Sequence, residues 1–263
     1  MITRLCQALT VGLGLAIPVL TAPAPAVARP VSADPAFYTG EAIITGRDIP
    51  SERLRGYQIA LPQVVAKVSG DSHLAASPAV QAALGQADSM VRDASFIDRL
   101  AKKKLMDEQG TRERSFLMTV RFDPAAVDRL IRAAGRQPWP EPRPTVRVSL
   151  RITDTVGPFL LTTDSPRGTG QREVITDVAR RIGLPVILPD DGSLPPPTPA
   201  ILTGEMVIRP EGGWTTVWTL VAASLPRPVT WSSPPGTFDR ALADGLEETS
   251  RALSPMASAV LPR

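Results

Sequence analysis

The sequence is poor in cysteine and histidine, two side chains that commonly act as nucleophile and catalytic base. The chain has one cysteine, Cys6, and one histidine, His73, so its main body cannot build a Cys-His dyad, a cysteine-rich zinc site or a histidine triad. His73 directly follows Ser72, and neighbouring residues do not readily face each other as base and nucleophile. We therefore interpret His73 as a capping or surface residue near a helix C-terminus.

Carboxylates offer the best case for catalysis. The aspartates that follow predicted strand ends in the second half are Asp154, Asp164, Asp190 and Asp191. If those strand ends meet at one edge of a sheet, the carboxylates could hold a divalent metal for hydrolysis. Because aspartate is also a favoured turn residue, turn formation is the preferred interpretation and a metal-assisted hydrolase is the alternative. No cofactor is predicted, since the loop at 168–170 lacks the rest of a dinucleotide or P-loop motif.

Arginines gather in the middle of the chain. They are Arg129, Arg132, Arg136, Arg143, Arg147 and Arg151. A positive seam centred on Arg143 and Arg147 could bind an anionic envelope component or the acidic face of another envelope protein. A solvated surface with salt bridges is the commoner explanation of such a pattern.

Three tryptophans complete the candidate binding residues. Trp214 and Trp218 lie four positions apart on one predicted strand, so they share a face, and Trp139 lies between the arginines. Core packing is the default interpretation of these side chains. If they were exposed, they would form an aromatic platform for a glycan or a peptide.

The start of the chain has the three parts of a signal peptide. Arg4 is followed by an apolar run over 5–20 and by small residues up to Ala28, after which we predict cleavage. The protein is thus expected in the periplasm, with a disordered mature N-terminus over 29–36. No later stretch is long and apolar enough to span a bilayer. Export and a net charge of only +3 argue against a nucleic acid as partner.

The rest of the sequence predicts an α+β protein of two small domains, each a mostly antiparallel sheet packed with helices. The N-terminal domain covers 37–135 and the C-terminal domain covers 145–254. Between them, residues 136–144 contain four prolines, which is typical of a stiff linker. Residues 255–263 are expected to form a flexible tail.

Several segments in order resemble one known family. They are VVAKVSG at 64–70, VRFD at 120–123 before a helix, Trp139 before Arg143, GLPVILP at 183–189, and LTG at 202–204 before Trp214 and Trp218. Together they are similar to the exported proteobacterial family DUF2066. This resemblance implies a Gram-negative envelope protein of a family without an established activity, so it supplies no catalytic residue.

The sequence therefore predicts a periplasmic, non-enzymatic binding or envelope-assembly factor. The arginine seam and the tryptophan face are its candidate contact surfaces. The alternatives are the metal-assisted hydrolase, which needs the aspartates to converge, and a glycan-binding module, which needs exposed tryptophans.

Overall fold

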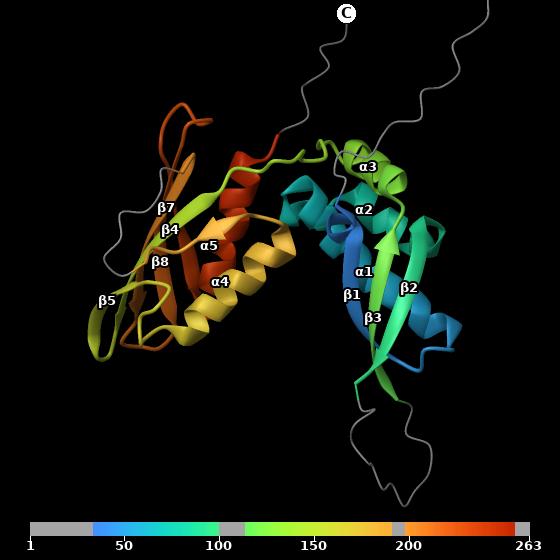
Figure 1. Ribbon diagram of the computed structural model, residues 1–263, viewed down its shortest axis with the longest axis horizontal. Helices are drawn as coiled ribbons and strands as arrows, with labels where there is room; N and C mark the ends of the chain where they lie inside the picture. Colours follow the sequence, from blue (N-terminus) through green and yellow to red (C-terminus); the bar gives the residue numbers. More distant parts are fainter. Residues whose placement is uncertain (1–33, 100–113, 191–197, 256–263) are drawn as a thin grey trace, which may run out of the picture.

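This computed structural model describes residues 34–99, 114–190 and 198–255 of the chain. It has an α+β fold, as predicted, with two sheets that each pack against helices (Figure 1). The predicted signal peptide, most of the segment 29–36 and all but the first residue of the predicted tail lie outside the described residues. Within the described ranges, no helix combines the length and apolar composition needed to cross a bilayer.

The first sheet has the strand order β1-β3-β2, and both pairings are antiparallel. Its strands are β1 (Thr39–Thr45), β2 (Val91–Asp98) and β3 (Ser115–Phe122). The helices of this half are η1 (Pro35–Tyr38), α1 (Pro50–Ser69), η2 (Ser72–Ala76), α2 (Pro78–Ala83), η3 (Leu84–Met90) and α3 (Pro124–Ala133). Because every second residue of β1 is buried, the sheet has one inner face, and α1 lies behind β1 on that side (Figure 1).

Helix α1 begins at Pro50 with Ile49 as its N-cap, and it continues through Pro62 without ending. It stops at Gly70, which adopts the left-handed conformation (φ 73°) that a glycine allows without strain.

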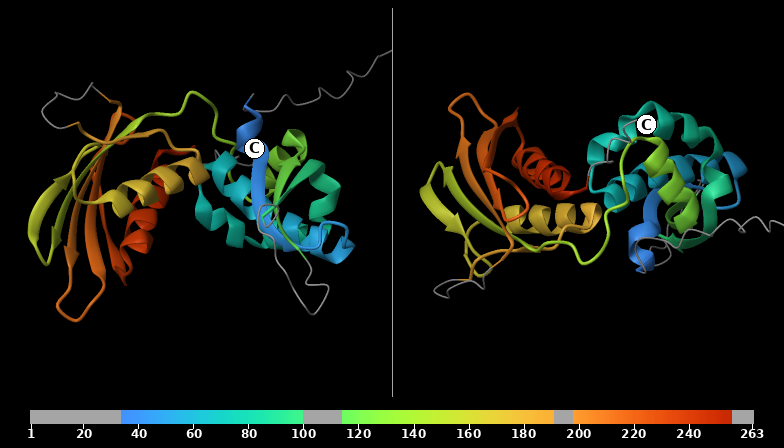
Figure 2. Two further views of the ribbon diagram at one scale, coloured as in Figure 1. Left: turned by 60° about the horizontal axis from the view of Figure 1, so that its bottom comes forward. Right: turned by 90° about the horizontal axis from the view of Figure 1, so that it is seen from above.

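The second sheet is mixed. Its main path is β5-β4-β7-β8-β9, and the short β6 also pairs with β4. The elements are β4 (Val146–Asp154), β5 (Gly157–Leu161), α4 (Thr169–Ile182), β6 (Val186–Ile187), β7 (Ala200–Ile208), β8 (Trp214–Ala222), β9 (Val229–Gly236) and α5 (Phe238–Leu253). Strand β4 runs parallel to β6 and β7, and the other pairs are antiparallel. Helices α4 and α5 cover one face (Figure 2).

Each half has its own hydrophobic core. The first core is built by residues between 37 and 134, and the second by residues between 139 and 253. Trp218 is fully buried in the second core, where its indole N–H donates to Ser233 Oγ at 3.1 Å. Gly204 and Gly245 make room for the indole, because a Cβ at either position would lie about 2.5 Å or less from the ring. Trp218 is therefore a structural residue.

Candidate binding site

Arg143, predicted as the centre of an anion-binding seam, is instead buried between the two halves. Its guanidinium donates to the carbonyl oxygen of Lys67 at 2.8 Å, and to those of Ile182 and Gly183 at 3.1 and 2.9 Å. Lys67 lies in the last turn of α1, while Ile182 ends α4. The last carbonyls of a helix have no partner inside the helix and carry partial negative charge. One cation therefore caps two helices, one from each half.

Aromatic rings enclose this guanidinium. Phe37 and Trp139 lie over it, with ring centres 4.3 and 4.6 Å from its central carbon. Burial lowers the pKa of Arg143 to about 10, so the side chain stays charged at neutral pH. Trp139 is itself buried and its backbone N–H donates to Val68 O at 2.8 Å. Arg143 and Trp139 thus lie in the interior of the molecule, which corrects the prediction that they form an exposed contact surface.

A second set of contacts joins the loop after α1 to α5. Arg136 is paired with Asp71 at 3.1 Å and also donates to the hydroxyl of Ser254, just after α5, at 2.9 Å; the Arg136 and Asp71 side chains are nearly buried. His73 Nε2 lies 3.3 Å from Glu248 Oε1, and the Ser250 hydroxyl donates to the carbonyl of the glycine that ends α1. His73 is thus a partly exposed residue of the junction, as its structural interpretation expected.

The other predicted binding residues lie apart from this junction. Arg147 lies half-buried on the helix-free face of the second sheet, because its neighbours Val146 and Val148 point into the core. Trp214 packs half-buried against the same core as Trp218. A glycan platform needs exposed rings, and these tryptophans do not provide one.

Asp154 serves the turn between β4 and β5. Its carboxylate accepts the backbone N–H groups of Val156 and Gly157 and pairs with Arg167 at 2.5 Å. The hydrogen bond from Arg167 lowers the pKa of Asp154, with a smaller effect from the N–H of Val156. These contacts match the turn interpretation of this residue.

Asp164 and Asp190 do come together, although they are far apart in sequence. Thr163 Oγ1 contacts the carboxylate of Asp164 and lies 2.8 Å from Asp190 Oδ1. A hydroxyl carries one proton, so it can donate to only one of the two at a time. Asp191 lies outside the described residues. In the part of the chain that the structure describes, no three acidic, histidine or cysteine side chains are grouped to hold a metal ion.

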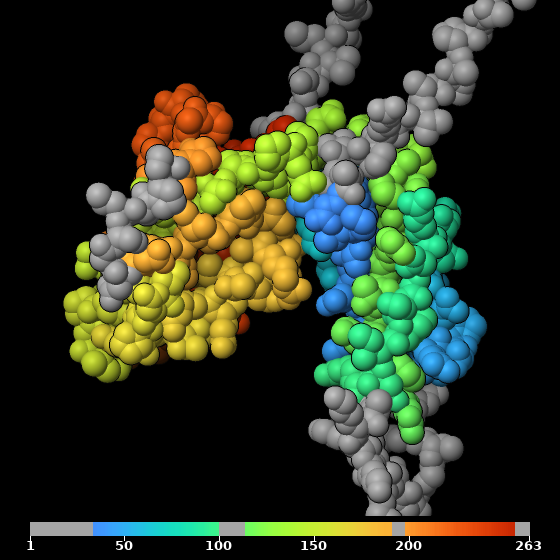
Figure 3. All heavy atoms as spheres, viewed as in Figure 1, coloured from blue at the N-terminus to red at the C-terminus, as the bar shows by residue number. Residues whose placement is uncertain are grey.

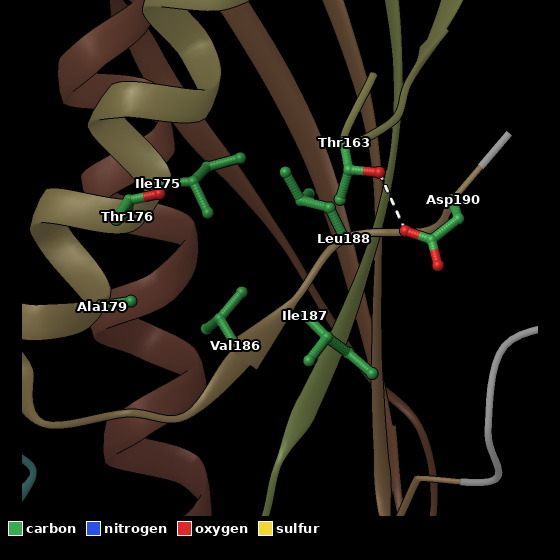
Figure 4. Close-up of a pocket in the computed structure, with 8 residues that line it drawn as sticks. All are labelled: Thr163, Ile175, Thr176, Ala179, Val186, Ile187, Leu188 and Asp190. Carbon is green, nitrogen blue, oxygen red and sulfur yellow. Dashed lines mark hydrogen bonds between the residues drawn. The ribbon is translucent and has the colours of Figure 1, made fainter. Parts of the chain in front are cut away.

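Beside these carboxylates, a pocket of about 580 Å³ opens between α4 and β6 (Figure 4). It is lined by Thr163, Ile175, Thr176, Ala179, Val186, Ile187, Leu188 and Asp190. Ile175 and Ala179 lie one turn apart and form the α4 wall, where alanine contributes only a methyl group and so leaves space. Val186 and Leu188 form the opposite wall, and both point toward α4 (Figure 4). The pocket is therefore mostly apolar along its walls, with Thr176 as the polar residue of the α4 wall, and polar at the end with Thr163 and Asp190.

Strand β6 leaves one side unpaired next to this pocket. The carbonyl of Pro185 accepts from the first residue of β4, and that of Pro189 accepts from Thr163 N at 3.0 Å. Because successive residues of a strand point their backbone groups to opposite sides, the N–H and C=O groups of Val186 and Leu188 face the other way. Among the described residues, no strand pairs with that side. No pattern within the sequence of β6 reveals this open side, because it depends on which strands pair.

A larger hollow, of about 950 Å³, lies between β1, α1 and the end of α4 (Figure 3). Its cations are Lys67, Arg180 and Arg181. Arg180 and Arg181 pair with Asp177, and Lys67 donates to two backbone carbonyls at 3.0 Å each. Burial lowers the pKa of Lys67. The cations are thus engaged within the protein, and the α4–β6 pocket is the better candidate for a ligand.

Comparison with known proteins corrects the predicted family. No curated protein matches this chain. The predicted resemblance to DUF2066 is wrong, and the segments that suggested it are ordinary features of the fold: 64–70 is the end of α1, and 183–189 surrounds β6. Residues 35–140, which run from η1 through α3 to the tryptophan of the junction, match instead a domain of unknown function, DUF8605.

Proposed function

We propose that the protein is a non-enzymatic binding or assembly factor of the cell envelope, which holds an apolar segment of a partner protein in the α4–β6 pocket. The observation that carries this proposal is the pocket itself, with two mostly apolar walls and polar groups at one end. Ligand sites commonly combine apolar walls with a few placed polar groups. The proposed location is the periplasm, from the signal-peptide pattern over 1–28.

The wall formed by α4 is held in place before any ligand arrives. Arg143 binds the carbonyls at the end of α4 and those at the end of α1, so α4 cannot shift without breaking contacts in both halves. A preformed site loses less conformational entropy on binding than a mobile one. This arrangement supports a role in recognition.

The alternatives have less support. The hydrolase requires several carboxylates around one point, but Asp154 is bound to Arg167 in its own turn. Asp164 and Asp190 remain as a pair on either side of the Thr163 hydroxyl. The glycan-binding module requires exposed rings, whereas Trp139 and Trp218 are buried.

Site-specific photo-crosslinking in cells tests the proposed function. A photoreactive residue is placed at Thr176, which is exposed on the pocket wall, or at Val217, which is exposed on the helix-free sheet face. We expect a partner protein to be crosslinked from position 176 only, and the crosslink to lie in an apolar segment of that partner. In an Ala179→Phe background the new ring fills the pocket, and this crosslink should disappear while the melting temperature stays near that of the parent.

Two results would contradict the proposed function. One is the same set of crosslinks from positions 176 and 217, because the pocket would then have no special role. The other is a crosslink at position 176 that persists after Ala179→Phe, since the partner would then lie outside the pocket.

A further inference from the structure

We infer that the partner segment binds as an added β strand on the side of β6 that pairs with no described strand, with alternate apolar side chains in the pocket and a basic side chain at Asp164 and Asp190. This inference rests on the proposed function of the same site. Beyond the proposed function, it specifies the backbone conformation of the bound segment and the sign of its charge.

The backbone of β6 offers the hydrogen bonds that such a strand needs. Val186 and Leu188 each direct one N–H and one C=O to the unpaired side. Residues two apart on a strand are about 6.6–6.8 Å apart, so these groups match two successive facing residues of an extended peptide. Addition of a strand to an exposed sheet edge is a common mode of peptide recognition, in which the main chain supplies affinity.

The side chains of β6 show where those of the added strand would go. Val186 and Leu188 point toward α4, while Ile187 points away from it (Figure 4). A strand beside β6 continues the same pleat, so every second side chain of the ligand also points toward α4. These side chains meet Ile175 and Ala179 in the pocket. The remaining ones face away and need not be apolar.

The polar end of the pocket sets the charge of the ligand. Asp190 is the charged residue among the described residues of the lining, and Asp164 lies beside it across the Thr163 hydroxyl. The carboxylate of Asp190 at the end of a mostly apolar pocket, with that of Asp164 nearby, attracts a cation and repels an acidic segment. A lysine or arginine at one end of the segment therefore complements this site.

Two other edges, those of β1 and β9, carry features that oppose such addition. On β1, the Gln63 amide accepts from Glu41 N at 3.0 Å and donates to Glu41 O at 2.7 Å, which replaces the bonds of a neighbouring strand. Strand β9 carries Pro234 and Pro235, and proline has no N–H to donate. Natural sheets commonly protect edges in these ways, so an apolar edge without such protection is the place for a partner.

Selection of displayed peptides provides the test. A library of random peptides of about ten residues is selected on the purified protein and counter-selected on Ala179→Phe. We expect the retained peptides to have valine, isoleucine or leucine at alternate positions and lysine or arginine near one end. Retained peptides with apolar residues at a spacing of three and four would indicate a bound helix and overturn the inference.

N-methylation of one retained peptide then tests the backbone contacts. Methyl groups on amides that face β6 should weaken binding by about tenfold, because each removes a hydrogen bond at an edge and blocks close approach. Methyl groups on the alternate amides should change affinity by less than about twofold. Equal sensitivity at all positions, or none at any, would overturn strand addition.

The charge is tested on the protein. Asp164→Asn with Asp190→Asn should weaken the basic peptides by about threefold to tenfold, as expected for partly exposed ion pairs. Asp177→Asn, on the exposed side of α4, is the matched control and should leave affinity unchanged. Equal affinity in all three proteins would overturn the assigned charge.

The two proposals fail in different ways. Suppose that the crosslink in cells depends on the pocket, but the selected peptides do not have apolar residues at every second position. The proposed function would then stand, and strand addition would be ruled out. Loss of pocket dependence in the crosslinking experiment would remove the proposed function itself.

Discussion

Strands β1 and β6 each have a side without a neighbouring described strand, but side chains bond the outward backbone groups of β1 only. Along β1, side chains of α1 bond the outward backbone groups: Gln63 bonds both groups of Glu41, and Arg55 donates to Ile43 O at 3.1 Å. Along β6, the outward groups of Val186 and Leu188 face no strand among the described residues, and a pocket adjoins them. The contrast shows that this fold can close a strand edge with side chains. We therefore explain the open edge of β6 by its use in binding a partner.

The closure of β1 depends on a match between the spacing of residues along helix α1 and the spacing along strand β1. Gln63 and Lys67 lie four residues apart on α1, which is about 6 Å along a helix. They reach Glu41 and Thr39, which lie two residues apart on β1 and so about 6.8 Å apart. One turn of helix thus spans nearly the same length as two residues of strand. A helix beside an edge can therefore replace a missing strand, provided that its side chains are polar.

Arg143→Met should have the largest effect, because Arg143 joins the half that carries β1 to the half that carries β6. The substitution keeps the stem but removes the donors to the ends of α1 and α4. We expect the free energy of unfolding to fall by about 2–6 kcal/mol, from one to three for each buried helix end left without a partner. Urea unfolding followed by tryptophan fluorescence measures the loss.

Arg147→Met is the matched control, because Arg147 lies on the helix-free sheet face. It should change stability by no more than about 0.5 kcal/mol. Similar losses in the two variants would show that the junction does not depend on Arg143.

Gln63→Leu should open the closed edge. It removes two hydrogen bonds to Glu41 at an exposed position, so we expect a loss of about 1–2 kcal/mol. It should also make the protein self-associate, because an uncapped strand edge pairs with other chains. Sedimentation velocity at several concentrations measures the association. Gln81→Leu, which removes an exposed amide bonded to Ala75 O, should stay at the sedimentation coefficient of the parent; association of both variants would argue against the capping role.

The sequence predicts the fold class because local patterns determine it. Alternating burial in β4 and β7 follows their alternation of apolar and polar residues. Helix α4 ends where Gly183 allows a left-handed residue. The family, by contrast, was predicted from short segments that many α+β proteins share, and it was wrong.

The candidate site depends on contacts that no local pattern encodes. An arginine among prolines is typical of an exposed linker, and only the meeting of two helix ends explains why Arg143 is buried. Asp164 and Asp190 come together because β5 and the segment after β6 both end beside Thr163. The open side of β6 depends on which strands pair, and periodicity within one strand does not reveal its neighbours.

The pH dependence of stability tests the role of Glu52 at the closed edge of β1. We expect a smaller change in the free energy of unfolding here, because this carboxylate is partly exposed. Hydrogen bonds from Arg55, and then from Thr45 N, lower the pKa of Glu52 from 4.5 to about 2. Its stabilising contribution is thus complete above pH 4.5 and is lost as the pH falls through about 2. The stability difference between the parent and Glu52→Gln should shrink over this range in urea unfolding. A difference that is the same at pH 6 and pH 2.5 would show that the ionised carboxylate does not cap β1.

Ile187→Lys tests the open edge and should have the smallest effect on stability. Ile187 points away from α4 and lies on the strand whose outer backbone groups have no strand partner among the described residues (Figure 4). A lysine there should change the free energy of unfolding by no more than about 0.5 kcal/mol, since Ile187 is only half-buried and a lysine can lay its stem along the strand while its charge stays in water. It should nevertheless weaken peptide binding in the displayed-peptide assay, because a charge on an edge strand opposes strand addition. Lost stability with unchanged binding would mean that Ile187 serves the fold; the expected result would mean that the edge is free for a partner.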